Sequence, residues 1–161
     1  MMEYRVRPAG AEDHDYLHYI IKATSAEQLE AWRWDEAVRE PVLELQYNAL
    51  INGIQGTYPG AEMCIIEISG APSGLLILHR GPTTFRVIDI TVAPEYRNRG
   101  IASRILTGII EEAHACGKSA SLQVMVINPA QRLYDRLGFQ RTGGDGVMIE
   151  MECCARAAAA L

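Results

Sequence analysis

A short basic turn from Arg97 to Gly100 is the stretch of this sequence whose residue types point most directly to chemistry. Arg97, Arg99 and Arg104 supply three cationic side chains with no acid between them. Gly100 lets the backbone come close to a ligand, and Ala102 leaves room beside it. A helix beginning here would add backbone N–H groups without intrahelical partners and a partial positive charge. The turn is therefore expected to hold an anion, most naturally a phosphate.

The residues around this turn predict a strand before it and a helix after it. Val87 to Val92 is a β-branched run, and apolar residues then recur at helical spacing from Ile101 to Ala115. Gly117 is placed to end that helix, and Ala120 to Ile127 reads as the next strand. Strand, helix and strand in this order favour a right-handed parallel crossover.

The rest of the chain predicts an α/β (α+β) domain of about six to seven strands. Before the turn we expect a strand from Tyr4 to Arg7, a helix capped by Asp13, a second short helix from the capping pattern Ser25 to Gln28, a helix with Pro41 in its first turn, and a hairpin of Met63–Ile68 and Leu75–His79. After the crossover we expect a helix from Pro129 to Leu137 ended by Gly138, and a hairpin of Phe139–Thr142 and Val147–Glu152. A single domain over residues 1–154 is predicted, with a frayed alanine-rich tail at 155–161.

The composition narrows the classes of function. The chain has 161 residues, 48% of them hydrophobic, which suits one well-buried core, and its net charge of −5 argues against nonspecific nucleic-acid binding. The apolar runs are too short to span a membrane and no secretory signal is visible, so a cytoplasmic protein is expected. The four cysteines form no C-x-x-C pair and lie beside no histidine at zinc-ligand spacing, so no metal site is expected.

Two motifs make the sequence resemble the GCN5-related N-acetyltransferase (GNAT) superfamily. The superfamily's acetyl-CoA signature is Arg or Gln, two residues, Gly, one residue, and Gly or Ala, which RNRGIA at 97–102 matches. That motif is weak by itself. The second motif, NPAQRLYDRLGF at 128–139, follows at the family's usual separation and is specific. The resemblance covers about Met63 to Met151.

The resemblance implies a fold and a cosubstrate. It implies a mixed, mostly antiparallel sheet with helices on both faces, whose parallel fourth and fifth strands splay apart around the pantetheine arm of acetyl-CoA. Backbone groups of two residues in the fourth strand would bind this arm, an asparagine would touch the cosubstrate from the fifth strand, and amides of the basic turn would hold the pyrophosphate. The residues implied in acetyl-CoA binding are Ile90, Val92, Arg97, Asn98, Arg99, Gly100, Ile101, Ala102, Ser103 and Asn128.

The resemblance also implies a reaction, the direct attack of a primary amine on the thioester. Tyr134 matches the family's usual general acid, which protonates the departing CoA thiolate. Asp89 stands where many relatives carry the acid that removes the amine proton. Glu67 and His79, on neighbouring strands, are alternatives for that base.

The acceptor stays open between a small-molecule amine and a protein or peptide amine, and neither nucleic acid nor membrane is expected as a partner. Trp32, Trp34 and Tyr58 lie in the segment that tends to line the acceptor pocket in this family. The acids of that segment, from Glu27 to Glu44, lean toward a cationic amine, although a solvated helix face explains them equally well. The alternative function is a noncatalytic acyl-CoA-binding sensor or interaction module. Both a monomer and a homodimer stay open.

Overall fold

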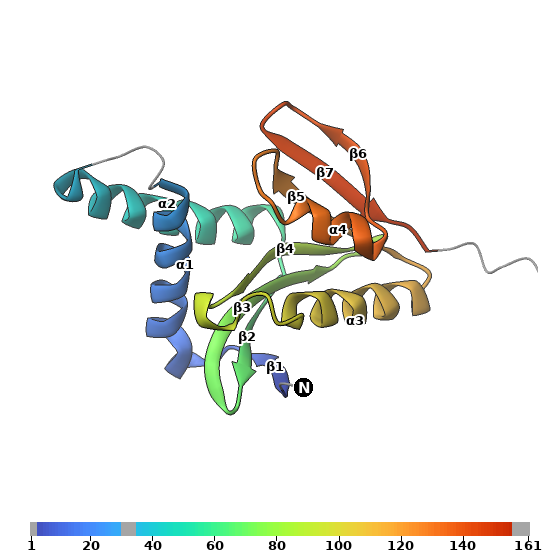
Figure 1. The fold of residues 1–161 in the computed structure, drawn as a ribbon, viewed down its shortest axis with the longest axis horizontal. Coiled ribbons are helices and arrows are strands. Elements are labelled where there is room, and N and C mark those ends of the chain that lie inside the picture. The colour runs from blue at the N-terminus through green and yellow to red at the C-terminus, as the bar shows by residue number, and fades with distance from the viewer. Residues whose placement is uncertain (1–2, 30–34, 156–161) are drawn as a thin grey trace, which may run out of the picture.

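The computed structural model describes residues 3–29 and 35–155, which build a seven-stranded sheet (Figure 1). The strands are β1 (Tyr4–Pro8), β2 (Glu62–Ile68), β3 (Ala71–Arg80), β4 (Thr84–Val92), β5 (Ser119–Met125), β6 (Gln140–Gly144) and β7 (Met148–Cys153). They lie in the order β1-β2-β3-β4-β5-β7-β6, and every neighbouring pair is antiparallel except β4 and β5. The predicted mixed sheet with a parallel fourth and fifth strand is confirmed.

The described helices cover both faces of this sheet. They are α1 (His14–Leu29), α2 (Glu36–Thr57), α3 (Ile101–Ala115) and α4 (Gln131–Leu137), with short 3-10 turns η1 (Ala11–Asp13) and η3 (Pro94–Tyr96). Alternate residues of a strand point to opposite faces, so Leu76 and Leu78 join the apolar cluster of α3, whereas Leu75 and Ile77 join that of α1. We name these two sides of the sheet the α3 face and the α1 face. Figure 1 shows α1 and α2 at one side of the molecule and β5, β6 and β7 at the other.

One continuous helix, α1, spans the first expected helix and the expected start of the second at Ser25. Its buried side is formed by Leu17, Ile20 and Ile21, as the spacing predicted. The predicted second start at Ser25 is wrong, because no Gly or Pro interrupts the helix before it. The Thr24 hydroxyl donates to the carbonyl oxygen of Ile20 at 2.9 Å, so the backbone is still helical where the capping pattern begins.

Asp13 fastens the start of α1 to the first strand. It was expected to cap the helix; its carboxylate instead accepts two hydrogen bonds from the Arg7 guanidinium, at 2.7 and 2.9 Å. The Gly10 N–H donates a third at 2.7 Å. Asp13 is 4% exposed, and these donors lower its pKa to about 2. The carboxylate therefore remains ionised and binds β1 to the turn that follows it.

The long helix α2 begins earlier than its proline suggested. Pro41 was expected in the first turn, but the helix begins at Glu36, so the proline lies in the second turn. A proline there removes one backbone hydrogen bond to Ala37. The buried side of α2, from Leu43 to Ile54, packs near α1 and compensates for that loss.

The hairpin of β2 and β3 is tighter than expected. We expected a loop from Ser69 to Gly74, but β3 already begins at Ala71. Ser69 and Gly70 have φ values of 53° and 80°, the left-handed pair that closes a two-residue hairpin turn. Residues 71–74, expected in the loop, therefore belong to β3, and only Ser69 and Gly70 form the turn.

The segment after α3 differs slightly from the prediction. β5 ends at Met125, two residues early, and α4 begins at Gln131, two residues late. The side-chain amide of Gln131 donates to the carbonyl oxygens of Met125, at 3.3 Å, and of Val126, which ends the strand and fixes the loop. Gly138, with a φ of 99°, ends α4 as predicted.

Two expectations from the sequence concern the alanine-rich tail and the length of the apolar helices. Apart from Ala155, the alanine-rich tail lies outside the described residues. In the described ranges, 3–29 and 35–155, no helix is both long and apolar enough to cross a membrane.

Candidate active site

The parallel strands β4 and β5 separate along their length. Their pairing ends with Val87 opposite Leu122. Beyond this point β4 continues to Val92 and β5 to Met125 without pairing between them. Backbone N–H and C=O groups along this β4–β5 opening can therefore bind an extended ligand instead of a strand.

A bulge in β4 determines which of its side chains lie on the α3 face and which on the α1 face. The pairing of β3 with β4 skips Ile88. Val87, Ile90 and Val92 all belong to the α3 cluster, and the spacing of three between the first two shows that the bulge has reversed the alternation. Asp89 consequently lies on the α1 face, whereas an unbulged strand would have directed it into the apolar core of the α3 face.

The backbone of β4 is also oriented by this pairing. Ala93 donates its N–H to the carbonyl oxygen of Ser73 at 2.8 Å. Because alternate residues of an antiparallel strand bond the same neighbour, Ile90 and Val92 turn their backbone groups away from β3 and toward the opening. The Val92 carbonyl oxygen already accepts a hydrogen bond from Nε of Arg97 at 3.0 Å. Ile90 and Val92 thus present backbone groups to the opening, with one acceptor, the Val92 carbonyl oxygen, engaged by the protein.

The loop between β4 and α3 ends in a turn that leaves the helix start accessible. Asn98 and Gly100 have φ values of 62° and 78°, both left-handed. A Cβ on Gly100 would meet no heavy atom within 4 Å, and no side chain caps the helix. The amides of Ile101, Ala102 and Ser103 have no intrahelical acceptor, because they belong to the first turn. This backbone can hold an anion, and the anion binding expected from the sequence remains a prediction.

Arg97 connects this loop to α1. Its guanidinium donates to both carboxylate oxygens of Glu27, each at 3.2 Å. Together with the bond to Val92, these contacts fix the loop between the end of β4 and the far end of α1. The sequence predicted Arg97 as a cosubstrate-binding residue but gave no sign of Glu27, which lies 70 positions away.

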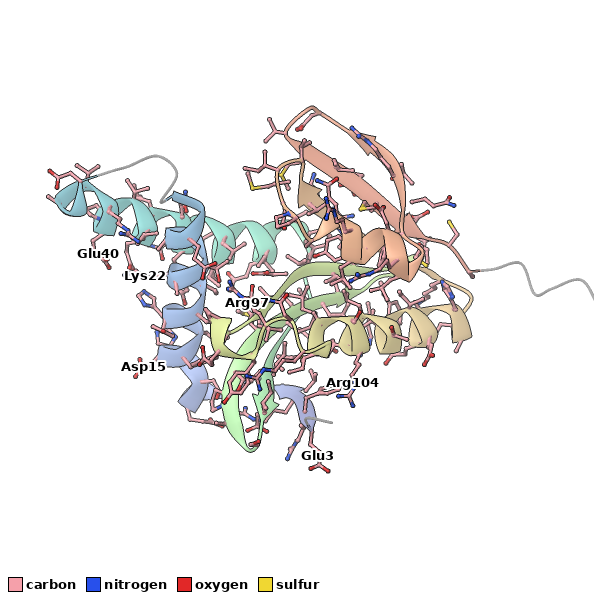
Figure 2. All side chains as sticks on the ribbon, viewed as in Figure 1. Glu3, Asp15, Lys22, Glu40, Arg97 and Arg104 are labelled. Carbon is pink, nitrogen blue, oxygen red and sulfur yellow. The ribbon has the colours of Figure 1, made fainter. Side chains whose placement is uncertain are left out.

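The other two arginines of the turn contact aromatic rings. The guanidinium of Arg104 lies 4.7 Å from the centroid of the Tyr4 ring, and that of Arg99 lies 6.0 Å from the centroid of Tyr96. Figure 2 shows Arg97 beside α1 and Arg104 next to β1. The three cations therefore do not converge on one point, and most of the anion-binding capacity resides in the backbone.

Asp89 lies on the part of β4 that borders the opening. Its carboxylate accepts hydrogen bonds from the Thr91 hydroxyl, at 3.1 Å, and from the Ile90 N–H. Loss of hydration on burial raises the pKa of Asp89, and these two bonds oppose that rise only in part. A raised pKa makes the carboxylate a stronger base. Thr91 was not predicted, although its position two residues further along the strand is the signal for a partner on the same face.

The two alternative bases are engaged elsewhere. Glu67 forms an ion pair with Arg7 at 3.1 Å. The His79 ring lies against Tyr58, with 5.3 Å between the ring centroids. Neither contact involves α4, the helix that carries the candidate acid. Trp32 and Trp34, the other predicted acceptor-pocket aromatics, lie outside the described residues.

Tyr134 approaches the opening from α4. It is 9% exposed, and its ring lies edge-on to Phe139 with 6.0 Å between centroids and 70° between planes. Burial raises the pKa of Tyr134, and the negative charge of Asp89 raises it further. The structure therefore brings the predicted acid and the predicted base into one electrostatic environment. The phenol remains protonated at neutral pH and can donate a proton.

Asn128 lies in the loop between β5 and α4. Its side-chain oxygen accepts a hydrogen bond from the Ala130 N–H at 2.9 Å, which orients the chain into α4. The predicted contact of Asn128 with acetyl-CoA remains a prediction, as do the other assigned contacts.

A separate hollow of about 480 Å³ lies on the α3 face, between α3 and β1 to β3. Its charged wall is paired internally, because Arg80 bonds Glu112 at 2.7 Å and also Glu62. Neither Asp89 nor Tyr134 lines it. This hollow is therefore distinct from the β4–β5 opening. Among the described residues, no group of three or more His, Cys, Asp or Glu side chains could hold a metal ion.

Known proteins resemble this chain in sequence pattern and in fold. Residues 23–139, well over half of the chain, match the model of the acetyltransferase (GNAT) family. No curated protein sequence matches the chain. Among solved structures it is similar to the PaiA N-acetyltransferase of Thermoplasma acidophilum in complex with coenzyme A, with 19% identity over 95% of this chain and 99% of that one, and a TM-score of 0.73.

Two further solved structures have the same fold. One is the ribosomal-protein-S18-alanine N-acetyltransferase of Escherichia coli, with 18% identity over 99% of each chain and a TM-score of 0.64. The other is yncA of Salmonella typhimurium with its cofactor acetyl-CoA, with 19% identity over 98% of this chain and 96% of that one, and a TM-score of 0.60. At these identities the structures show the fold, and the family model decides the assignment. The chain belongs to the acetyltransferase (GNAT) family.

Proposed function

We propose that this protein transfers the acetyl group of acetyl-CoA to a primary amine by direct attack of the amine on the thioester. The observation that carries the proposal is the β4–β5 opening, which has Asp89 on one strand and Tyr134 on the helix across from it. The uncapped start of α3 lies at the end of the loop that leaves β4. An elongated thioester with a phosphate-bearing tail fits this order of groups.

The residues present suit acetyl-CoA. Backbone groups of Ile90 and Val92 would bind the pantetheine arm, and Asn128 would contact it from the β5 side. The amides from Asn98 to Ser103 would hold the pyrophosphate, since a Cβ at Gly100 would meet only open space and the helix end is positive. Arg97 and Arg99 would add positive charge around it. Two of the similar structures contain coenzyme A or acetyl-CoA, which supports this choice of cosubstrate.

Each side chain has one step in the proposed chemistry. A protonated amine cannot attack, so Asp89 accepts a proton from the ammonium group, directly or through water. The amine nitrogen then bonds the acetyl carbon and the carbon–sulfur bond breaks. Tyr134 gives its proton to the departing sulfur and regains one from solvent, the nitrogen loses its second proton to solvent, and Asp89 releases the first proton to solvent before the next turnover. No covalent bond to the protein forms.

The acceptor is an amine of a small molecule or of a protein. The Escherichia coli relative acts, by its name, on an alanine of a ribosomal protein. Three of the acids that leaned toward a cationic acceptor are paired within the chain: Glu27 bonds Arg97, and both Glu40 and Glu44 bond Lys22. Figure 2 shows Lys22 and Glu40 close together between α1 and α2. The Lys22 pairs therefore hold the two helices together, the Glu27 pair holds α1 to the loop after β4, and these three acids lend no support to a cationic acceptor.

A panel of amines tests the proposal. The protein is incubated with acetyl-CoA and each amine, and both free CoA thiol and acetylated amine are measured. Acetyl transfer predicts equal amounts of the two products, with thiol release that depends on the amine. Binding of acetyl-CoA without amine-dependent thiol release over a broad panel would favour a noncatalytic acyl-CoA-binding module instead.

A further inference from the structure

The β5 and β7 half of the α1 face has no helix over it in the described chain. On β5, Leu122 and Val124 are buried toward α3, whereas Gln123 is exposed and Met125 is partly exposed on the opposite side. In Figure 1, α1 and the start of α2 lie at the other side of the molecule from β5 and β7, and only the C-terminal end of α2 comes near the strands. This half of the sheet therefore presents its side chains to solvent next to the β4–β5 opening.

The end of this open half nearest the opening is apolar. Met125 and Met148 are directly opposite each other in the β5–β7 pair, and both are partly exposed. Just beyond them, Val126 is 41% exposed, Ile127 83% and Val147 61%. The Val126 N–H donates to the Val147 carbonyl oxygen at 2.8 Å, so the two segments lie side by side. We name Met125 and Met148 the methionine floor, and the three exposed residues the apolar rim.

The backbone beneath this surface is fixed by side chains. The carboxylate of Asp145 accepts the N–H groups of Val147 and Met148 at 2.9 and 2.8 Å. On the other side, Gln131 bonds the carbonyl oxygens at the end of β5. Apolar side chains held in the open gain nothing for folding, but they are preorganised for a ligand.

The methionine floor lies on the same face of the sheet as Asp89, across the β4–β5 opening. Ser121 is paired with Arg86 across the parallel strands, so their side chains share a face, and Met125 lies on that face four residues along. The β4 bulge brings Asp89 to the same face, and α4 carries Tyr134 from the loop that follows Met125. An amine whose nitrogen lies between Asp89 and Tyr134 would direct its substituent over the methionine floor.

Glu150, the acid next to the methionine floor, is already paired with an arginine. Glu150 lies two residues from Met148 on the same face of β7, and Arg86 donates to both of its carboxylate oxygens, at 2.7 and 2.8 Å. This bidentate contact lowers the pKa of Glu150, which keeps the pair charged and closed. A polycationic acceptor would have to break that pair to gain an anion, whereas an apolar group loses nothing by contacting the methionines.

We propose that the acceptor is a primary amine with an apolar group close to its amino carbon, and that Met125, Met148 and Ile127 bind that group. The inference rests on the acetyl transfer proposed above and specifies its acceptor class. Methionine side chains are flexible and polarisable, so they suit an apolar group of variable shape. An alkyl or aryl amine and a peptide N-terminus with a large apolar first residue share this chemistry.

Four acceptors distinguish the possibilities: phenethylamine and a leucine-initiated tetrapeptide as apolar amines, and spermidine and a serine-initiated tetrapeptide as polar ones. We expect kcat/KM to favour the better apolar acceptor over both polar ones by roughly 10- to 100-fold. Ile127→Gln should lower this ratio about tenfold, and it should not unfold the protein because Ile127 is 83% exposed. The matched control is Leu45→Gln, which replaces a side chain 69% exposed on α2 and should leave the ratio unchanged.

The outcomes separate this inference from the function on which it rests. Higher kcat/KM for spermidine or the serine peptide, or an unchanged ratio in Ile127→Gln, would overturn the apolar acceptor and leave acetyl transfer standing. If the protein binds acetyl-CoA but neither the four acceptors nor the broader panel of amines causes release of CoA thiol, both the apolar acceptor and acetyl transfer would be overturned. Preference for phenethylamine or for the leucine peptide supports the inference in either case and identifies the source of the amine.

Discussion

Replacing Tyr134 with phenylalanine removes the proposed proton donor and almost nothing else. The ring keeps its edge contact with Phe139, and no described group hydrogen-bonds the hydroxyl. We therefore expect the free energy of unfolding and that of acetyl-CoA binding to change by less than about 1 kcal/mol. Turnover should fall by roughly 10²- to 10⁴-fold, the usual contribution of a positioned acid. That loss corresponds to about 3 to 5 kcal/mol of transition-state stabilisation.

The assay is the initial rate of thiol release with an active acceptor at saturating acetyl-CoA. The defect should lower kcat and kcat/KM together, because the proton is donated only in the transition state. It should shrink with an acyl donor whose thiol is more acidic. Since burial and Asp89 raise the pKa of Tyr134, the loss of wild-type activity that follows ionisation of Tyr134 should come only at alkaline pH, and the variant should lack that loss. Wild-type kcat in Tyr134→Phe would remove Tyr134 from the mechanism.

Three further variants test other parts of the site and the fold. Gly100→Glu should weaken acetyl-CoA binding roughly tenfold or more in calorimetry, because it places a negative charge at the helix start and a side chain at a φ of 78°; an unchanged Kd would place the pyrophosphate elsewhere. Asp89→Asn should lower turnover most at low pH, and a pH profile parallel to wild type would indicate a role other than base. Because the pKa of Asp89 is raised in the folded protein, wild type has its full stability below the ordinary carboxyl pKa and loses part of it as pH rises. The Tm of Asp89→Asn should therefore exceed that of wild type toward neutral pH and equal it near pH 3. Asp13→Asn should lower Tm at pH 7, where wild type has the full benefit of its ionised carboxylate, and the difference should vanish as pH falls from about 4 through about 2; equal Tm values at pH 7 would contradict the role given to the Arg7 contact.

Local patterns were sufficient to predict the centre of the fold. The β-branched run up to Val92, the left-handed Gly100 and the apolar spacing from Ile101 to Ala115 act over a few residues each, and strand, turn and helix are found where they predicted. The N-terminal helices were less predictable. The Ser25 pattern resembles a helix start but lies inside α1, and Pro41 is tolerated in the second turn of α2 because packing outweighs one lost hydrogen bond.

The site was predictable where it depends on neighbours in sequence and not where it depends on pairing. Asp89 and Tyr134 were predicted from a family resemblance, and in the structure the charge of Asp89 acts on Tyr134, while their catalytic roles remain predictions. The bulge at Ile88, which turns Asp89 out of the core, follows from the register with β3 and leaves no local signal. The same holds for the bond of Glu27 to Arg97 and for the methionine floor, since both join residues distant in sequence.

A crystal structure of the protein with coenzyme A is the most direct test of the central claim, that the β4–β5 opening binds the cosubstrate. We expect the pantetheine arm between β4 and β5, the pyrophosphate against the amides from Asn98 to Ser103, and the thiol between Asp89 and Tyr134. Coenzyme A bound instead in the hollow between α3 and β1 to β3, away from both side chains, would contradict the account.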